Sequence, residues 1–173
     1  GLYRRMPVAA LRAVEPGDLE AAIAACRTFG VPLTMRGAGT SLAGQTVGPG
    51  LIVDCSALRD VHIDPTARTA QVQPGVVLDQ LNRTAFAHGL AFGPDVATAN
   101  RATLGGMIAN NSAGARSIAY GLTADHVEEL DVVLADGSFV TASESKHKDL
   151  FWGLRGGGGN FGVVTSFLFR THP

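Results

Sequence analysis

Glycine is distributed unevenly in this sequence, and its clusters constrain the fold more than any other feature. The 173 residues include 22 glycines, which concentrate at 37–50, 89–93, 105–121 and 153–162. Glycine weakens the interior of helices and strands, so a cluster marks tight turns or a close approach of the backbone to another group. A bend explains any single cluster, but four clusters in one small domain favour a ligand enclosed by main-chain atoms.

The last cluster contains G-x-G-x-x-G at 157–162, the fingerprint of dinucleotide-binding βαβ units. That fingerprint acts only where it follows a strand and begins a helix. Here the order is reversed, because 147–155 is typical of a short helix and 162–169 is rich in β-branched and aromatic residues that favour a strand. The pattern therefore predicts a helix-to-strand turn, with a nicotinamide cofactor at 155–162 as the weaker alternative.

Composition and charge limit the class of protein. An apolar content of 46% is enough for the core of one compact domain. The net charge is −1 with mixed signs along the chain, which argues against a nucleic-acid partner. No apolar stretch approaches the roughly 20 residues of a membrane span, and no signal peptide is expected. We expect Cys26 and Cys55 to be buried free thiols of a cytoplasmic protein, and no metal site, because the five histidines lack ligand spacing.

The first part of the chain predicts a small parallel α/β lobe. A strand over 7–14 is followed by a helix over 16–30, which begins with proline, repeats apolar residues at i, i+3, i+4 and i+7, and ends with glycine. Two further strands are predicted over 31–36 and 51–56. The second is apolar throughout its first part, as a strand buried on both faces would be.

The second part predicts an antiparallel sheet with helices. Hairpins are predicted over 61–74 and 127–143, the latter turning at Asp-Gly, with a helix over 76–89, a short helix or turn over 102–109 and a last strand over 163–169. The fold class is therefore α+β in two lobes, with the first lobe over about 1–58 and the second over about 59–173.

The segment MRGAGTSLAGQTVGPG at 35–50 is a candidate anion-binding loop. Successive amides of such a loop can form a nest around an anion, glycines let the backbone come close, and the hydroxyls of Thr40 and Ser41 add donors. Arg36 either supplies positive charge or pairs with a neighbouring carboxylate. No G-K-[ST] follows, so this is not a Walker P-loop. A flexible surface loop is the alternative.

A second segment of small and polar residues, GPDVATANRATLGGMIANNSAGARSIAYG at 93–121, favours the ligand site. Paired glycines are followed by two amides, a hydroxyl and another glycine. Such a surface suits a flat polar ring with a phosphate tail better than an apolar ligand. Turn and capping roles are the alternative for Asn110, Asn111 and Ser112.

These segments together resemble the FAD-binding domain of the vanillyl-alcohol oxidase and p-cresol methylhydroxylase (PCMH) superfamily. The resemblance is carried by RGAGTSLAGQ (36–45), QPGVVLDQLN (73–82), the 93–121 segment and VVLADG (132–137). These motifs look most like the branch of glycolate oxidase subunits, D-lactate dehydrogenases and D-2-hydroxyglutarate dehydrogenases, whereas the part from residue 147 is closer to berberine-bridge-type oxidases. The resemblance implies a two-lobed PCMH-type fold in a single FAD-binding domain over 1–173.

The resemblance also implies which residues bind FAD. The first loop would hold the pyrophosphate through Arg36, Gly37, Ala38, Gly39, Thr40, Ser41 and Leu42, with Gly44 and Gln45 nearby. The second segment would line the flavin through Pro94, Thr103, Gly105, Gly106, Asn110, Ser112, Gly114 and Tyr120. The last strand would pass the cofactor with backbone contacts from Gly162, Val163 and Val164.

Two departures from the family pattern qualify these expectations. Berberine-bridge-type enzymes often attach flavin through a His in the first loop and a Cys after a YGLT-like segment, whereas this chain has Thr40, Ser41 and Ala124. Non-covalent FAD is therefore expected. The substrate-binding domain of the family has no counterpart in this sequence, so the catalytic residues are not identified.

The implied function is oxidation of an alcohol carbon, that of a 2-hydroxy acid, by hydride transfer to the flavin while a base takes the hydroxyl proton. Asp125 and His126 are local candidates for the base, but a backbone cap and a structural role are favoured for them. Arg116 either favours the reduced flavin or pairs with Glu128 or Glu129. The alternative function is a stand-alone or engineered flavin-binding module without a specific substrate.

Overall fold

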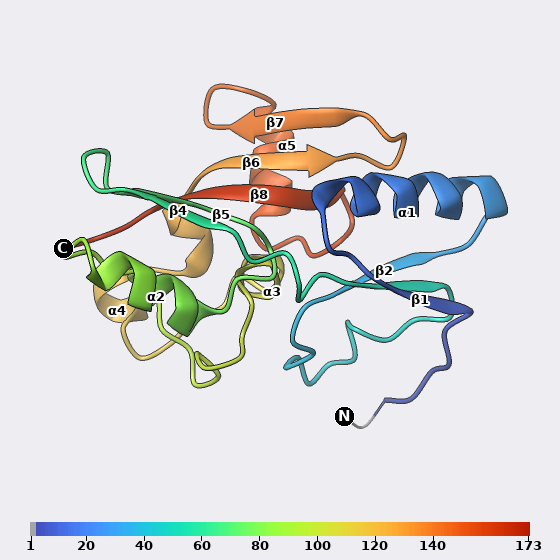
Figure 1. Ribbon diagram of the computed structural model, residues 1–173, viewed down its shortest axis with the longest axis horizontal. Helices are drawn as coiled ribbons and strands as arrows, with labels where there is room; N and C mark the ends of the chain where they lie inside the picture. The colour runs from blue at the N-terminus through green and yellow to red at the C-terminus, as the bar shows by residue number, and fades with distance from the viewer. Residues whose placement is uncertain (1–2) are drawn as a thin grey trace.

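The structure is a computed structural model that describes residues 3–173 of the chain. Its strands form two sheets, one of three strands and one of five. Figure 1 shows the smaller sheet on the right, in blue to cyan, and the larger sheet extending from the centre to the left and top, in green, orange and red. The predicted two-lobed α+β fold is confirmed.

The smaller sheet is parallel. Its spatial order is β1 (Ala9–Arg12), β3 (Leu51–Asp54) and β2 (Leu33–Arg36), so β3 is central. Ile52 and Val53 of β3 are buried, as predicted for a strand covered on both faces.

The long helix α1 (Pro16–Phe29) connects β1 to β2 and packs against β3. Proline occupies its first turn, where no intrahelical N–H is needed. The Asp18 carboxylate accepts hydrogen bonds from the main-chain N–H groups of Val14 (2.7 Å) and Glu15 (3.2 Å). Gly30 ends the helix in the left-handed conformation, with φ of 61°. These signals placed the predicted helix correctly.

The larger sheet is antiparallel throughout. Its spatial order is β4 (Val61–Asp64), β5 (Thr69–Val72), β8 (Val163–Arg170), β6 (Val127–Val133) and β7 (Phe139–Ser143). Both predicted hairpins are present, and the last strand lies between them. Because β8 pairs with both β5 and β6, the C-terminal strand is the central strand of the sheet.

Helices and a 3-10 turn complete the second lobe: α2 (Leu78–Phe86), α3 (Leu104–Ala109), α4 (Ser117–Tyr120), η1 (Thr123–His126) and α5 (Lys148–Leu154). The helix predicted over 76–89 is thus shorter at both ends. The two four-residue elements, α4 and η1, were not predicted, because a single turn carries no periodic apolar pattern.

Each lobe has its own cluster of buried apolar side chains. The larger cluster fills the space between the five-stranded sheet and α2, α3 and α5, and the smaller one lies beneath α1. Val133 at the end of β6 and Val163 at the start of β8 belong to the smaller cluster. The two lobes are therefore joined by an apolar contact, which burial of such side chains stabilises.

The two cysteines differ in their surroundings. Cys55 is buried, and this burial, with the neighbouring charge of Asp54, raises the pKa of its thiol to about 12. Cys26 is partly exposed at the edge of the buried stripe of α1, so the prediction that both thiols are buried is wrong for Cys26. Both thiols are free. Among residues 3–173, no helix has the length and apolar character needed to cross a bilayer.

Candidate functional site

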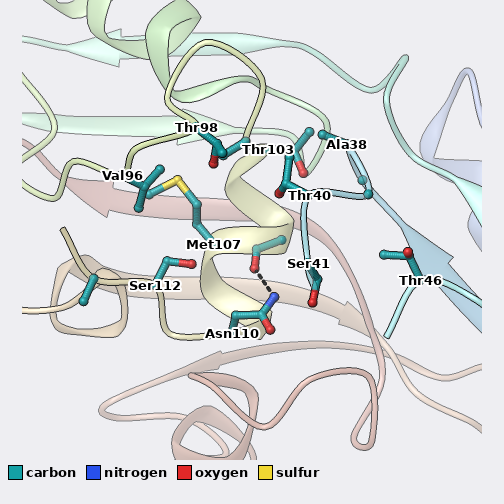
Figure 2. Close-up of a pocket in the computed structure, with 15 residues that line it drawn as sticks. Ala38, Thr40, Ser41, Thr46, Val96, Thr98, Thr103, Met107, Asn110 and Ser112 are labelled. Atoms are coloured by element: carbon teal, nitrogen blue, oxygen red, sulfur yellow. Dashed lines mark hydrogen bonds between the residues drawn. The ribbon is translucent and has the colours of Figure 1, made fainter. Parts of the chain in front are cut away.

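A cleft of about 320 Å³ lies between the two lobes. Figure 2 shows the loop after β2 along one wall, α3 along the floor and side chains from 96–98 and 112 on the opposite side. Its lining residues are Gly37, Ala38, Gly39, Thr40, Ser41, Thr46, Val96, Thr98, Ala102, Thr103, Gly106, Met107, Asn110, Ser112 and Ala113.

The loop 37–46 presents a run of unpaired main-chain amides. None of its N–H groups donates a hydrogen bond to any group in the described residues 3–173. Main-chain N–H groups of folded proteins are normally paired, with protein groups or with water. Successive free amides in a glycine-rich loop form the concave donor surface that binds anions. The wall of the cleft is therefore suited to a phosphate-bearing ligand.

The conformation of this loop depends on glycine at two positions. Gly39 has φ of 69°, and a Cβ there would lie 2.6 Å from the Arg36 guanidinium. A Cβ at Gly37 would collide with the Thr103 hydroxyl, because the loop touches the residue that precedes α3. The close approach predicted from the glycine cluster is thus, in part, an approach to Arg36 and to α3.

Arg36 lies at the base of the loop. Its Nη1 is 3.4 Å from both the carbonyl oxygen and the Oγ1 of Thr46. Within the described part of the chain, no carboxylate is at ion-pairing distance from Arg36. The alternative that this arginine pairs with a neighbouring carboxylate is therefore wrong, and its positive charge stays available beside the free amides.

The floor of the cleft is held from beneath by hydrogen bonds. The Asn110 amide donates to the Gly106 carbonyl at 2.9 Å. Next to it, the Asn111 carbonyl oxygen accepts from the main-chain N–H of Ala124 at 2.9 Å. The Thr123 hydroxyl donates to the main-chain oxygen of Ser112 at 2.6 Å. Capping roles are thus confirmed for the asparagines, while Asn110 and Ser112 also line the cleft.

The cleft brings together residues from both predicted binding segments. Those that line it are Gly37, Ala38, Gly39, Thr40, Ser41, Thr103, Gly106, Asn110 and Ser112. The remaining predicted residues lie outside its lining, namely Arg36, Leu42, Gly44, Gln45, Pro94, Gly105, Gly114, Tyr120, Gly162, Val163 and Val164. Leu42 is 86% exposed, and Gly105 and Gly114 face main-chain atoms of Pro74 and Asp95.

Sequence reasoning missed six lining residues: Thr46, Val96, Thr98, Ala102, Met107 and Ala113. A signal was present for Met107, which follows Thr103 by four residues and precedes Asn110 by three. Residues with that spacing share one face of a helix. The others are small or apolar residues whose pattern is that of ordinary core or turn positions, so no signal distinguished them.

Tyr120 belongs to an aromatic cluster rather than to the cleft. Its main-chain oxygen lies 2.8 Å from His126 Nε2, and His172 Nε2 lies 3.1 Å from His126 Nδ1. Burial lowers the pKa of both histidines. A neutral His126 can therefore donate to Tyr120 and accept from His172, which confirms its structural role.

Two further charged residues near this cluster also have structural contacts. The Asp125 carboxylate accepts from the main-chain N–H of Leu122 at 2.7 Å, which confirms the predicted backbone cap. The Arg116 guanidinium lies 4.7 Å from the centre of the Tyr120 ring. In the described residues it forms no ion pair with the glutamates of β6, so that predicted alternative is wrong.

The fold and the cleft together define a domain that binds a phosphate-bearing cofactor. Sequence comparison specifies which one: residues 7–143 match the family described as FAD binding domain. The chain belongs to this family of FAD-binding domains, and the resemblance to the PCMH-type superfamily is confirmed.

Similar proteins act on hydroxylated compounds of two kinds. Xylooligosaccharide oxidase of Thermothelomyces thermophilus is 36% identical over 96% of this chain and 35% of its own length. D-2-hydroxyglutarate dehydrogenase of Pseudomonas putida is 42% identical over 79% of this chain and 14% of its own. The structure of Acremonium strictum glucooligosaccharide oxidase, described as revealing a novel flavinylation, matches with a TM-score of 0.88 and 31% identity. The match covers 96% of this chain and 35% of the other. The chain thus spans about a third or less of these proteins.

Proposed function

We propose that this chain is the FAD-binding domain of an enzyme that oxidises an alcohol carbon, with a 2-hydroxy acid as the substrate. The placement of the cofactor rests on the run of unpaired main-chain amides at 37–46, across the cleft from α3. The dehydrogenase and the oligosaccharide oxidases among its relatives support an alcohol as the oxidised group. The 42% identity to the dehydrogenase favours the 2-hydroxy acid.

The chemistry of the cleft fits the two parts of FAD. The amides of 37–46 and the hydroxyls of Thr40 and Ser41 donate to the pyrophosphate, and Arg36 adds positive charge. Thr103, Gly106, Asn110 and Ser112 line the part proposed for the flavin. Contacts from Gly162, Val163 and Val164 at the start of β8 are proposed as well. When bound, FAD supplies the acceptor for the hydride that leaves the alcohol carbon.

We propose one domain over 1–173, with lobes over 1–58 and 59–173. The shared apolar contact of Val133 and Val163 supports treating the lobes as one unit. Because the relatives are about three times longer or more, the substrate pocket and the catalytic base are proposed to lie in sequence beyond the matched part. Limited proteolysis of the protein, which should leave this domain intact and carrying FAD, tests the organisation.

We infer that FAD is held without a covalent bond. A covalent attachment needs a nucleophilic side chain such as His or Cys beside the flavin, and the cleft is lined by neither. Thr40 and Ser41 stand in the loop instead. Visible absorbance of the purified protein, repeated on the supernatant after acid precipitation, tests this. Flavin colour that stays in the pellet would show a covalent bond and contradict the inference.

Stereoselective turnover of a 2-hydroxy acid by the full-length protein, with a dye as electron acceptor, tests the substrate. The expected result is reduction of the dye with one enantiomer only. Bound FAD with no turnover of any 2-hydroxy acid or sugar would favour the alternative, a flavin-binding module without a specific substrate. Competition of NADH with FAD would instead support a nicotinamide cofactor.

We also propose that the protein works in the cytoplasm, which the two free thiols support. Fractionation of the source cells, with recovery of the protein in the cytoplasmic fraction, tests this location.

A further inference from the structure

Gln45 lies outside the lining of the cleft but connects two residues that line it. The Ser41 hydroxyl donates to Gln45 Oε1. Gln45 Nε2 donates to Asn110 Oδ1 at 3.1 Å, and Asn110 Nδ2 donates in turn to the Gly106 carbonyl at 2.9 Å. The dashed line in Figure 2 marks this last bond, with Ser41 to its right. A chain of hydrogen bonds thus links the loop 37–46 to α3 across the boundary between the lobes.

The direction of donation is the same along the whole chain. Each of the two amides accepts one hydrogen bond through its oxygen and donates one through its nitrogen. Reversing either amide would place two donors or two acceptors against each other. The orientation of Gln45 is therefore set by Asn110, because the Ser41 hydroxyl can donate or accept, and an apolar side chain of the same length could not make either hydrogen bond.

The loop meets α3 at a second point. Gly37 packs against Thr103, the residue that precedes α3, while Gln45 contacts Asn110, the residue that follows it. The unpaired amides lie between these two contacts. The loop is therefore held along the length of α3 by one packing contact and one exposed hydrogen bond.

We infer that Gln45 is a positioning residue that acts through Asn110 to keep the loop 37–46 closed over the bound cofactor and so slows the release of FAD. This rests on the proposed function, because it requires FAD in this cleft. Both side chains are exposed, so water competes for their hydrogen bond and its contribution to folding is small. Its effect is expected when the loop must separate from α3 to let the cofactor leave.

The first experiment compares the rate of FAD release from the protein and from Gln45→Met, followed by the recovery of flavin fluorescence. Methionine keeps the length of the side chain and removes both hydrogen bonds. We expect release to be about two- to tenfold faster, with an unchanged rate of FAD association. The melting temperature of the FAD-free protein should not change. Gln71→Met is the matched control, because Gln71 is an exposed glutamine with one bond, to Ser166 at 3.4 Å, on the larger sheet.

The second experiment repeats Gln45→Met in an Asn110→Ala background. If Gln45 acts through Asn110, Gln45→Met does not speed up FAD release any further in this background. If Gln45→Met speeds up FAD release equally in both backgrounds, Gln45 contacts FAD directly and the inference is overturned. Release from Gln45→Met at the rate of the Gln71→Met control would overturn it as well. A lower melting temperature of the FAD-free Gln45→Met protein would show a merely structural role and overturn it too. Failure of the unmodified protein to bind FAD would overturn the proposed function itself.

Discussion

Two glycine-rich segments of this chain, the loop 37–46 and the turn 155–162, differ in how many of their main-chain amides donate hydrogen bonds within the protein. No amide of the loop donates a hydrogen bond within residues 3–173. In the turn, Gly156 donates to Leu154 (3.0 Å), Gly157 to Gly153 (3.1 Å) and Gly158 to Ala109 (3.2 Å). The loop thus leaves all its donors for a ligand, whereas the first three glycines of the turn use theirs to connect α5 to its neighbours. The amides of 159–162 donate no hydrogen bond within the described residues.

The two segments also differ in what their glycines approach. A Cβ at Gly157 would collide with the Gly153 carbonyl and lie 2.6 Å from the Phe161 ring. The turn is thus packed against the protein at Gly157 but open at Gly158 and Gly159. None of its glycines lines the cleft between the lobes, whereas Gly156 and Gly157 line a second pocket beside α5. Glycine therefore permits a close approach of the backbone in both segments, and at Gly156 and Gly157 the hydrogen bonds of the amides show that this approach is to protein.

The largest expected effect is that of Gly39→Val on FAD binding. A branched residue at φ of 69° introduces backbone strain of about 1–3 kcal/mol, and its Cβ would lie 2.6 Å from the Arg36 guanidinium. The strain shifts the backbone of the loop and the contact displaces the guanidinium, so both kinds of donor move away from the phosphate. Since each 1.4 kcal/mol is a factor of ten, we expect FAD affinity to fall about 100-fold or more, measured by titration of the FAD-free protein.

Gly159→Val is the matched control for that substitution. Gly159 belongs to the other glycine-rich segment, and no atom lies within 4 Å of the position of its Cβ. The Gly159→Val protein should bind FAD with the affinity of the unmodified protein. Purification of Gly39→Val with a full complement of FAD would show that the loop 37–46 does not hold the pyrophosphate.

Gly157→Ala should lower stability without a specific effect on FAD. The added methyl group overpacks the turn against the Gly153 carbonyl and Phe161. Overpacking of this kind typically costs about 1–3 kcal/mol, which denaturant unfolding would measure. FAD affinity of the folded protein should change less than about threefold. Loss of nucleotide binding at unchanged stability would instead support a dinucleotide site in the turn, and the comparison of the two segments would fail.

A smaller effect is expected from pH at the cluster that holds Tyr120. Burial lowers the pKa of His126 below its ordinary value of 6.5. The unfolded chain therefore binds a proton that the folded chain resists, and the free energy of unfolding should fall as the pH drops below about 6.5. His172 beside it responds in the same direction, and the facing charges are those of Asp125, Arg170 and Arg116.

Unfolding in urea at several pH values between about 8 and 5 measures this dependence. His126→Gln should reduce the slope and leave the part that comes from His172, whereas His62→Gln, at an exposed position of β4, should not change it. A slope that is the same in His126→Gln as in the unmodified protein would assign the pH dependence to other groups.

The sequence was sufficient to predict the elements whose signals are local. The capped helix α1, the Asp-Gly hairpin of β6 and β7 and the turn between α5 and β8 each follow from residues close together in the chain. The loop 37–46 was found from its glycines and hydroxyls. These features require no knowledge of what packs against them.

The rest depends on contacts between distant residues. Tyr120 lies in a segment of small polar residues, yet it faces His172 from the end of the chain. Gln45 was expected near the pyrophosphate of FAD, and its amide is directed to Asn110, 65 residues away in the sequence. Whether a polar residue contacts a ligand or another residue is decided by such pairings, and no local pattern carries that information.

The smallest expected effect is that of Gly159→Ala, which compares an open glycine of the turn with the packed Gly157. The position has open space within 4 Å and its φ is not positive, so alanine requires no rearrangement. A reduced entropy of the unfolded chain offsets any residual cost, and the free energy of unfolding should stay within about 0.5 kcal/mol of the unmodified value. Denaturant unfolding and FAD titration measured beside Gly157→Ala check this. If the two substitutions are equally harmful, glycine is needed throughout the turn for a reason other than packing, and bound nucleotide becomes the first candidate.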